Sequence, residues 1–230
     1  MANYLIIGAS SGIGEELVKQ LNAEGHTVYG TYHSHQVIHD SIHYQKLNVL
    51  DEDLHLDLPE ELEGLVYSPG SIQLRPFNRI KADEFIKDLQ LNLAGAVKVI
   101  QLALPKLKNG VAPSILLFST VAVKLGLPFH SMVAASKGAI EGFTRALAAE
   151  LAPKIRVNCI APSLTDTPLA NSLLSTADKK QANADRHPLK KIGSSADIAQ
   201  MASFILSSRA SWITGQILAV DGGLSSLKTG

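Results

Sequence analysis

The stretch GASSGIG at residues 8–14 decides how this chain folds. It directly follows the apolar run 4–7 and opens a segment in which Ile13, Leu17 and Leu21 recur at a spacing of four. A short apolar strand, a glycine-rich turn and an amphipathic helix in this order are typical of the first unit of a dinucleotide-binding βαβ fold. The opening residues therefore predict an α/β domain that binds a nucleotide.

Each glycine of this turn has a separate use. Gly8 permits a tight turn, Gly12 lets the backbone approach the phosphates, and Gly14 permits close packing of the helix. The helix N-terminus then offers unpaired N–H groups and the positive end of its dipole to the anion. A purely structural strand–helix turn is the alternative. The residues expected to contact a dinucleotide here are Gly8, Ser10, Ser11, Gly12 and Ile13.

Short apolar runs alternate with longer helical patterns along the rest of the chain, which predicts parallel strands joined by crossover helices. The expected strands are 4–7, 26–31, 43–47, 64–67, 114–118, 155–160 and 216–220, and the expected helices are 13–24, 81–107, 132–151 and 196–207. Residues 33–42 leave scarcely any room for a crossover helix. No linker divides residues 1–230, so we predict one domain: a Rossmann-type doubly wound parallel sheet of about seven strands with helices on both faces.

Composition excludes several classes of partner. The chain has 230 residues, of which 21 are basic and 21 acidic, so no global field recruits nucleic acid or an anionic membrane. No apolar run approaches the roughly 20 residues of a membrane span, and we expect no signal peptide. The single cysteine, Cys159, lies in a predicted buried strand and suits a reducing, cytoplasmic environment. The histidines lack metal-ligand spacing, so we predict no metal site.

The spacing G-x3-G-x-G of the turn and the last third of the chain resemble the short-chain dehydrogenase/reductase family. The matching segments are Arg156-Val157-Asn158, Ala161-Pro162-Ser163, Thr165-Asp166-Thr167-Pro168, Thr214-Gly215-Gln216 and Asp221-Gly222-Gly223. The resemblance covers essentially the whole chain. It implies a nicotinamide-dependent oxidoreductase that takes NADP or NAD and acts on a small-molecule substrate.

The resemblance also implies roles for single residues. Asn92 and Lys137 match two members of the family's catalytic tetrad. In the family this lysine binds the nicotinamide ribose and lowers the pKa of a neighbouring tyrosine, because a nearby cation favours the phenolate. Thr167 matches the hydroxyl that holds the nicotinamide amide. Further positions that match cofactor contacts are Asn48, Val49, Gly70, Pro162 and Thr165.

The pattern breaks at the catalytic tyrosine. Val133 stands four residues before Lys137, where the family keeps the tyrosine, and Thr120 stands at the position of the catalytic serine. A threonine hydroxyl can still donate to a substrate carbonyl, and the adjacent Ser119 should face the opposite way if the strand continues. Valine has no proton to donate, although positioned acid–base catalysis is worth roughly 10²–10⁴-fold.

A replacement acid stands nearby. His130 lies seven residues before Lys137, the spacing at which enoyl reductases of the same superfamily place their tyrosine. If the helix has begun by then, positions 130, 133 and 137 share one face. Histidine titrates near neutral pH and can supply a proton. The alternative is a partly exposed loop histidine without a role.

The end of the second strand bears on the choice of cofactor. NAD enzymes usually place a carboxylate there to hold the ribose hydroxyls. Here Tyr32 occupies the position, His33 follows it, and no acid is present. We therefore expect NADP rather than NAD, although no arginine or lysine lies in residues 30–35. In the segment 66–70, Gly70 is retained but the family's two asparagines are missing, and we interpret Tyr67 as a packing residue.

Two functions follow. The first is an NADP-preferring reductase of a small carbonyl or activated alkene, with a modified catalytic site in which His130 is the candidate proton donor. The second is a nicotinamide-nucleotide-binding protein without turnover, a redox sensor or scaffold partner. Residues 168–191 are expected to form a substrate-binding lid. The resemblance implies a homotetramer or homodimer built through the helices at 81–107 and 132–151.

Overall fold

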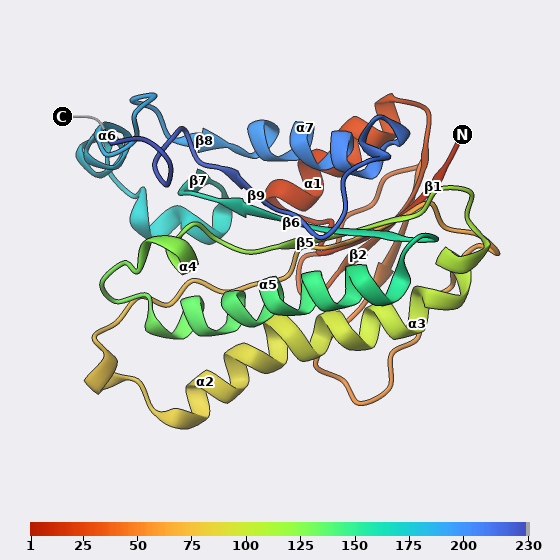
Figure 1. Cartoon of the computed structure of the whole chain (residues 1–230), viewed down its shortest axis with the longest axis horizontal. Coiled ribbons are helices and arrows are strands. Elements are labelled where there is room, and N and C mark those ends of the chain that lie inside the picture. Colours follow the sequence, from red (N-terminus) through yellow and green to blue (C-terminus); the bar gives the residue numbers. More distant parts are fainter. Residues whose placement is uncertain (229–230) are drawn as a thin grey trace.

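The computed structural model describes residues 1–228 and has one central sheet of parallel strands (Figure 1). In chain order its strands are β1 (Asn3–Ile7), β2 (Thr27–Tyr32), β3 (Ile42–Lys46), β4 (Gly64–Tyr67), β5 (Ser114–Phe118), β6 (Arg156–Pro162) and β9 (Ile217–Val220). Their order in space is β3-β2-β1-β4-β5-β6-β9. The predicted doubly wound sheet is confirmed. The strand order reverses between β1 and β4, and ligands of such sheets bind at the carboxyl ends beside that reversal.

Helices cover both faces of the sheet (Figure 1). On one face lie α1 (Gly12–Ala23) and α7 (Ser195–Leu206), and on the other lie α2 (Ala82–Leu89), α3 (Gly95–Asn109) and α5 (Ser131–Leu151). The bounds agree with the predicted helices to within a few residues, apart from one interruption. Residues 33–41 contain no helix, as their length predicts.

Each face has its own apolar core. Leu17 and Leu21 of α1 are fully buried against the sheet on one side, and Ile140 of α5 is buried on the other. Burying an aliphatic side chain of this size contributes about 1.5–3 kcal/mol. These contacts fix α1 and α5, whose N-termini face the carboxyl edge of the sheet.

The helix predicted as continuous over 81–107 is interrupted. Between α2 and α3, residues Gln90–Ala94 form a π-helical turn. The hydroxyl of Tyr67 donates a hydrogen bond of 2.6 Å to the carbonyl of Leu91. A Cβ on Gly95 would lie 2.4 Å from the same hydroxyl. Tyr67 therefore packs beneath this turn, and burial raises the pKa of its phenol.

Several short elements lie at the carboxyl edge of the sheet and were not predicted. They are α4 (Ala122–Leu125), the paired strands β7 (Thr165–Asp166) and β8 (Gly193–Ser194) and a 3₁₀ turn at Pro168–Leu173. The helix α6 (Ala177–Asp185) lies within 173–184 and one residue beyond, where the polar sequence predicts a helix. The expected lid, 168–191, thus consists of the 3₁₀ turn, α6 and a loop. Within the described residues, no helix is both long and apolar enough to span a membrane.

Candidate active site

The glycine turn has the backbone geometry that its spacing predicts. Gly8 and Gly12 have φ of +78° and +57°, a region that side chains disfavour. A Cβ on Gly14 would lie 2.2 Å from the carbonyl oxygen of Gly8, so only glycine lets α1 begin this close to β1. The N–H of Gly8 donates to the Thr31 hydroxyl at 3.1 Å, which ties the turn to β2.

The N-terminus of α1 is not capped by a side chain. Ser11 takes the N-cap position in an extended conformation (φ −161°) and makes no side-chain hydrogen bond to the helix. A Cβ on Gly12 would lie 3.4 Å from the Cβ of Thr167. The turn and the loop after β6 therefore face each other across a narrow gap, which suits a phosphate-bearing ligand at the helix N-terminus.

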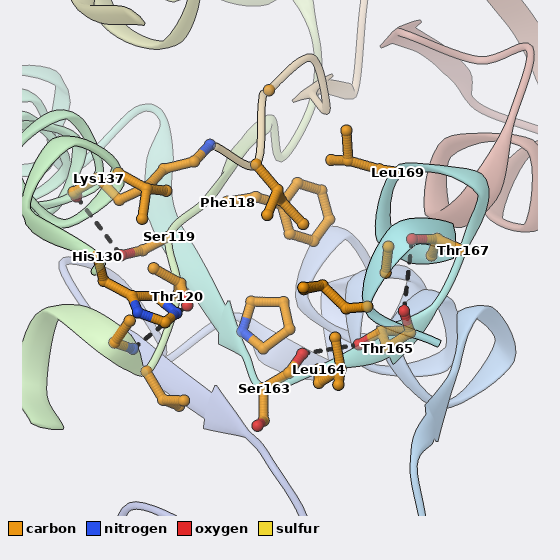
Figure 2. Close-up of a pocket in the computed structure, with 18 of the residues that line it drawn as sticks. Phe118, Ser119, Thr120, His130, Lys137, Ser163, Leu164, Thr165, Thr167 and Leu169 are labelled. Atoms are coloured by element: carbon orange, nitrogen blue, oxygen red, sulfur yellow. Dashed lines mark hydrogen bonds between the residues drawn. The ribbon is translucent and has the colours of Figure 1, made fainter. Parts of the chain in front are cut away.

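A cavity of about 290 Å³ opens at the carboxyl ends of the central strands (Figure 2). Of the predicted site residues, those on its wall are Ile13, Gly70, Thr120, His130, Lys137, Pro162, Thr165 and Thr167. Those outside its wall are Gly8, Ser10, Ser11, Gly12, Tyr32, His33, Asn48, Val49 and Asn92. Figure 2 shows Thr120, His130 and Lys137 on one side and Thr165 and Thr167 on the other.

Lys137 supplies a buried amine to this cavity. Burial lowers the pKa of Lys137 from 10.5 to about 8, and the interactions with Cys159 and Asp88 act in the opposite direction. A Cβ on Gly70 would lie 3.3 Å from Nζ of Lys137 and 3.4 Å from Oδ1 of Asn92. Because Gly70 has no side chain, its backbone can lie close to both Nζ of Lys137 and Oδ1 of Asn92.

Asn92 lies in the π-helical turn and is completely buried. Its Nδ2 donates to the carbonyl of Asp88 at 2.9 Å, whereas Oδ1 accepts no hydrogen bond from any described residue. Unsatisfied buried oxygens are uncommon and usually have a water or ligand partner. Oδ1 is thus available beside Gly70 and Lys137.

Thr120 and Ser119 both border the cavity, contrary to the expectation that they face opposite ways. Strand β5 ends at Phe118, so the alternation of a strand does not extend to these residues. The Ser119 hydroxyl donates to Glu141 at 2.8 Å. Oγ1 of Thr120 accepts from the N–H of Ala122 at 3.3 Å, and no described residue takes its proton. Thr120 can therefore donate to a ligand oxygen.

Val133 and His130 continue the same wall. Val133 is buried one turn before Lys137 and contributes only methyl groups to the cavity. His130 is half-buried at the N-cap of α5. Its Nδ1 lies 2.7 Å from the carbonyl oxygen of Pro128, so Nδ1 carries a proton and Nε2 is left for another partner. The preceding residue, Phe129, has φ of +67°, an unfavourable value for an aromatic residue.

Two polar pairs at the site were not predicted. The hydroxyl of Ser163 lies 2.8 Å from Nε2 of His187, a buried ring whose Nδ1 faces the carbonyl of Asn183 at 2.8 Å. The carboxylate of Asp88 is buried between two serine hydroxyls. Of these residues, only Asp88 could have been suspected from the sequence. It stands four residues before Asn92, and residues at that spacing lie on the same side of a helix.

The residues expected to contact the adenosine, Tyr32, His33 and Asn48, lie at or just after β2 and β3. Tyr32 is half-buried and His33 exposed. In the parallel register, Tyr32 pairs with Lys46 of β3, a lysine that the sequence reading overlooked because it is 14 residues away along the chain. The side chain of Asn48 binds Asp51 at 2.6 Å and closes a turn. No cluster of metal-ligating side chains occurs among residues 1–228.

Comparison with known proteins places this arrangement in a family. A family model described as "Enoyl-(Acyl carrier protein) reductase" matches residues 55–225. A tropinone reductase homolog of Arabidopsis thaliana is 31% identical, with 97% of this chain and 92% of the relative covered. The 3-oxoacyl-[acyl-carrier-protein] reductase of Thermotoga maritima is 32% identical, with 96% of both chains covered.

The chain belongs to the short-chain dehydrogenase/reductase family. Its structure resembles that of the ligand-free aldohexose dehydrogenase of Thermoplasma acidophilum, with a TM-score of 0.88 and 25% identity over 100% of this chain and 97% of the other. A 3-ketoacyl-(acyl-carrier-protein) reductase of Brucella melitensis, complexed with NADH, has a TM-score of 0.83 and 25% identity over 97% and 98% of the two chains. As a short-chain dehydrogenase/reductase, this protein is an oxidoreductase of the NAD(P)-dependent type.

Proposed function

We propose that this short-chain dehydrogenase/reductase is an NADPH-preferring reductase of a small, largely apolar carbonyl or activated alkene, and that its catalytic site is modified. One observation carries the proposal. Val133 lines the cavity one turn before Lys137, at the family's tyrosine position, while Thr120, Lys137 and Gly70 border the same cavity. The cofactor apparatus is thus retained around a site that lacks the usual acid.

The residues present fit a nicotinamide dinucleotide. The uncapped N-terminus of α1 suits the pyrophosphate, and a side chain at Gly14 would collide with Gly8. Lys137 would hold the nicotinamide ribose, and Thr167 would hold the amide. Asn92, whose buried Oδ1 has no partner among the described residues, would hold a relay water. When bound, the reduced cofactor supplies a hydride to the substrate carbon.

The protein must then deliver one proton to the substrate. For a carbonyl, Thr120 donates a hydrogen bond to the oxygen, and the charge of Lys137 stabilises the negative charge that develops there. We assign the proton itself to Nε2 of protonated His130, which becomes neutral and recovers a proton from solvent through the accessible part of its half-buried ring. The hydrogen bond from Nδ1 to Pro128 fixes the ring in the orientation that this transfer needs.

The cavity indicates the class of substrate. Leu127, Leu164 and Leu173 supply apolar wall, and Arg186 lies on the wall beside the lid. Apolar walls with a few convergent polar groups are typical of sites for small organic ligands. A compact ketone, quinone or enone fits a cavity of about 290 Å³.

The preference for NADPH is supported by the end of β2. No carboxylate stands there to repel a ribose phosphate, and Lys46 lies beside Tyr32 in the sheet. A lysine ammonium binds phosphate as a point charge. We therefore propose that Lys46 contributes to the affinity for NADPH over NADH.

A silent nucleotide-binding protein is the second candidate, favoured by the missing tyrosine. The experiment that separates the two follows the absorbance of NADPH, then NADH, with a panel of ketones, quinones and activated alkenes, alongside the Kd of each cofactor. We expect oxidation of NADPH by at least one class. Tight binding of NADPH without turnover of any class would favour the silent protein.

A further inference from the structure

Asp88 is a buried carboxylate that the proposed reaction does not use. It lies on α2 with 6% of its surface exposed. Oδ2 accepts a hydrogen bond of 2.5 Å from Ser136 on α5, and Oδ1 accepts one from Ser71 in the loop after β4. Among the described residues, no lysine, arginine or histidine nitrogen lies within 4.0 Å of this carboxylate. A buried charge held only by hydroxyls is costly, so its retention calls for an explanation.

The two hydroxyl partners stand next to the centre of the site. Ser71 directly follows Gly70, and Ser136 directly precedes Lys137. One carboxylate therefore joins the loop that carries Gly70 to the helix that carries Lys137. The contact that it secures is close, because a Cβ on Gly70 would lie 3.3 Å from Nζ of Lys137.

The same carboxylate acts on the charge of Lys137. The titratable groups that act on this amine are Asp88 from α2 and Cys159 from β6. Glu141, one turn further along α5, is held by Ser119. Burial disfavours the ammonium form of Lys137, and the negative charge of Asp88 favours it. The burial of Cys159 raises the pKa of its thiol to about 12, so this thiol carries no charge at neutral pH. Asp88 is therefore the anion that opposes the cost of burying Lys137.

We propose that Asp88, held by Ser71 and Ser136, is a positioning residue that keeps the ammonium of Lys137 charged and close to Gly70 inside the cavity. The relevance of this role to catalysis rests on the proposed function. The role itself does not, because it concerns the protein without cofactor or substrate. Val133 makes it more important, since no phenol stands beside Lys137 to share its charge.

The test measures the titration of Lys137 directly. The cofactor-free protein is labelled with trace 1-fluoro-2,4-dinitrobenzene between pH 6 and 11, and the extent of labelling of the Lys137 peptide is read by mass spectrometry. Only the free amine reacts, so the midpoint reports the pKa of Lys137. For Asp88→Asn we expect the midpoint to fall by about one pH unit, a roughly fivefold rise in free amine at pH 7.

Asp83→Asn is the matched control, because Asp83 is an exposed acid on the same helix. It should leave the midpoint unchanged. Asp88→Ser serves as a second neutral variant if Asp88→Asn does not fold, as judged by circular dichroism. A folded neutral variant with the wild-type midpoint would overturn the proposal even if its stability had fallen, because a merely structural Asp88 predicts that result. A shifted midpoint in a protein that reduces nothing would support the role of Asp88 and contradict only the reductase.

Discussion

The two sides of the proposed ligand site differ in the groups that act on the ligand: one side uses the backbone and the other uses side chains. The glycine turn at residues 8–14 acts through backbone groups and through the absence of side chains, since a Cβ on Gly14 would lie 2.2 Å from Gly8. The start of α5, residues 130–137, acts through side chains: a histidine at the rim, a valine in the wall and a buried lysine. A side chain can be replaced without disturbing the helix that carries it. We therefore expect the glycine turn to tolerate substitution less than the start of α5 does.

The largest effect is expected from breaking the backbone side. Gly14→Ala places a methyl group against the carbonyl of Gly8, which cannot move without displacing β1. Overpacking of this kind costs roughly 1–3 kcal/mol or more of unfolding free energy. We also expect the Kd for NADPH to rise at least about 100-fold, an effect of roughly 2.8 kcal/mol. Urea unfolding and cofactor fluorescence measure the two effects.

Gly142→Ala is the matched control for this substitution. Gly142 is an exposed residue of α5 with no atom within 4 Å of its added Cβ. Alanine there should raise the unfolding free energy by about 0.5–1 kcal/mol and leave cofactor binding unchanged. Equal effects of the two alanines would contradict the steric account of the turn.

The second prediction concerns the side-chain half. The pKa of Lys137 is about 8 in the folded protein and 10.5 as the reference value, so a charged Lys137 destabilises the fold by an amount on the order of 3 kcal/mol below pH 8. Lys137→Met removes that cost but leaves Asp88 without its counterion, so we expect a net gain of roughly 1–3 kcal/mol at pH 7. Activity should be lost.

The stability difference between wild type and Lys137→Met should depend on pH. Between pH 8 and 10.5 the folded wild type binds fewer protons than the unfolded chain, so its unfolding free energy rises with pH in this window. The advantage of Lys137→Met should therefore shrink from pH 8 upwards. Thermal melts at several pH values check this, and an advantage that grows above pH 8 would refute the assigned shift.

A third prediction sharpens the comparison at the far end of the cofactor. Lys46→Glu puts a negative charge beside Tyr32, where we place the ribose phosphate. We expect the Kd for NADPH to rise about tenfold, or roughly 1.4 kcal/mol, and the Kd for NADH to stay nearly constant. Lys108→Glu changes the net charge equally at an exposed position on α3 and should affect neither cofactor. A parallel change in both Kd values would place the phosphate elsewhere.

The smallest effect is expected at the loop that leads into α5. Phe129 has φ of +67° and 57% of its surface exposed, so glycine relieves strain there and loses little packing. Phe129→Gly should raise the unfolding free energy by about 1 kcal/mol. Gly126 has φ of +63° and open space around it, so Gly126→Ala should lower that free energy by a similar amount. Chemical denaturation compares the two, and changes of the same sign would contradict the strain argument.

Features with a local cause were predictable from the sequence. The strands and long helices follow from apolar periodicity, and the geometry of Gly8 and Gly12 follows from their place between strand and helix. Features that depend on distant partners were not predictable. The π-helical turn at 90–94 depends on the hydroxyl of Tyr67, and the nearness of Lys46 to Tyr32 depends on strand register.

The candidate active site was predictable only in part. Spacing alone places 130, 133 and 137 along one wall, but the contact that positions Lys137 depends on Ser71, Asp88 and Ser136 from three separate elements. No sequence motif predicts that residues from three separate elements form hydrogen bonds to one another. The buried Asp88 could be suspected only from its spacing to Asn92.

The central claim is that His130 does the work of the missing tyrosine, and one measurement tests it most directly. Enzyme loaded with NADPH is mixed with the best substrate of the panel, and the single-turnover rate is compared between wild type, His130→Ala and His55→Ala, which alters an exposed histidine remote from the site. We predict a fall of roughly 10²–10⁴-fold for His130→Ala alone, with an unchanged Kd for NADPH. Equal rates for all three proteins would contradict the claim.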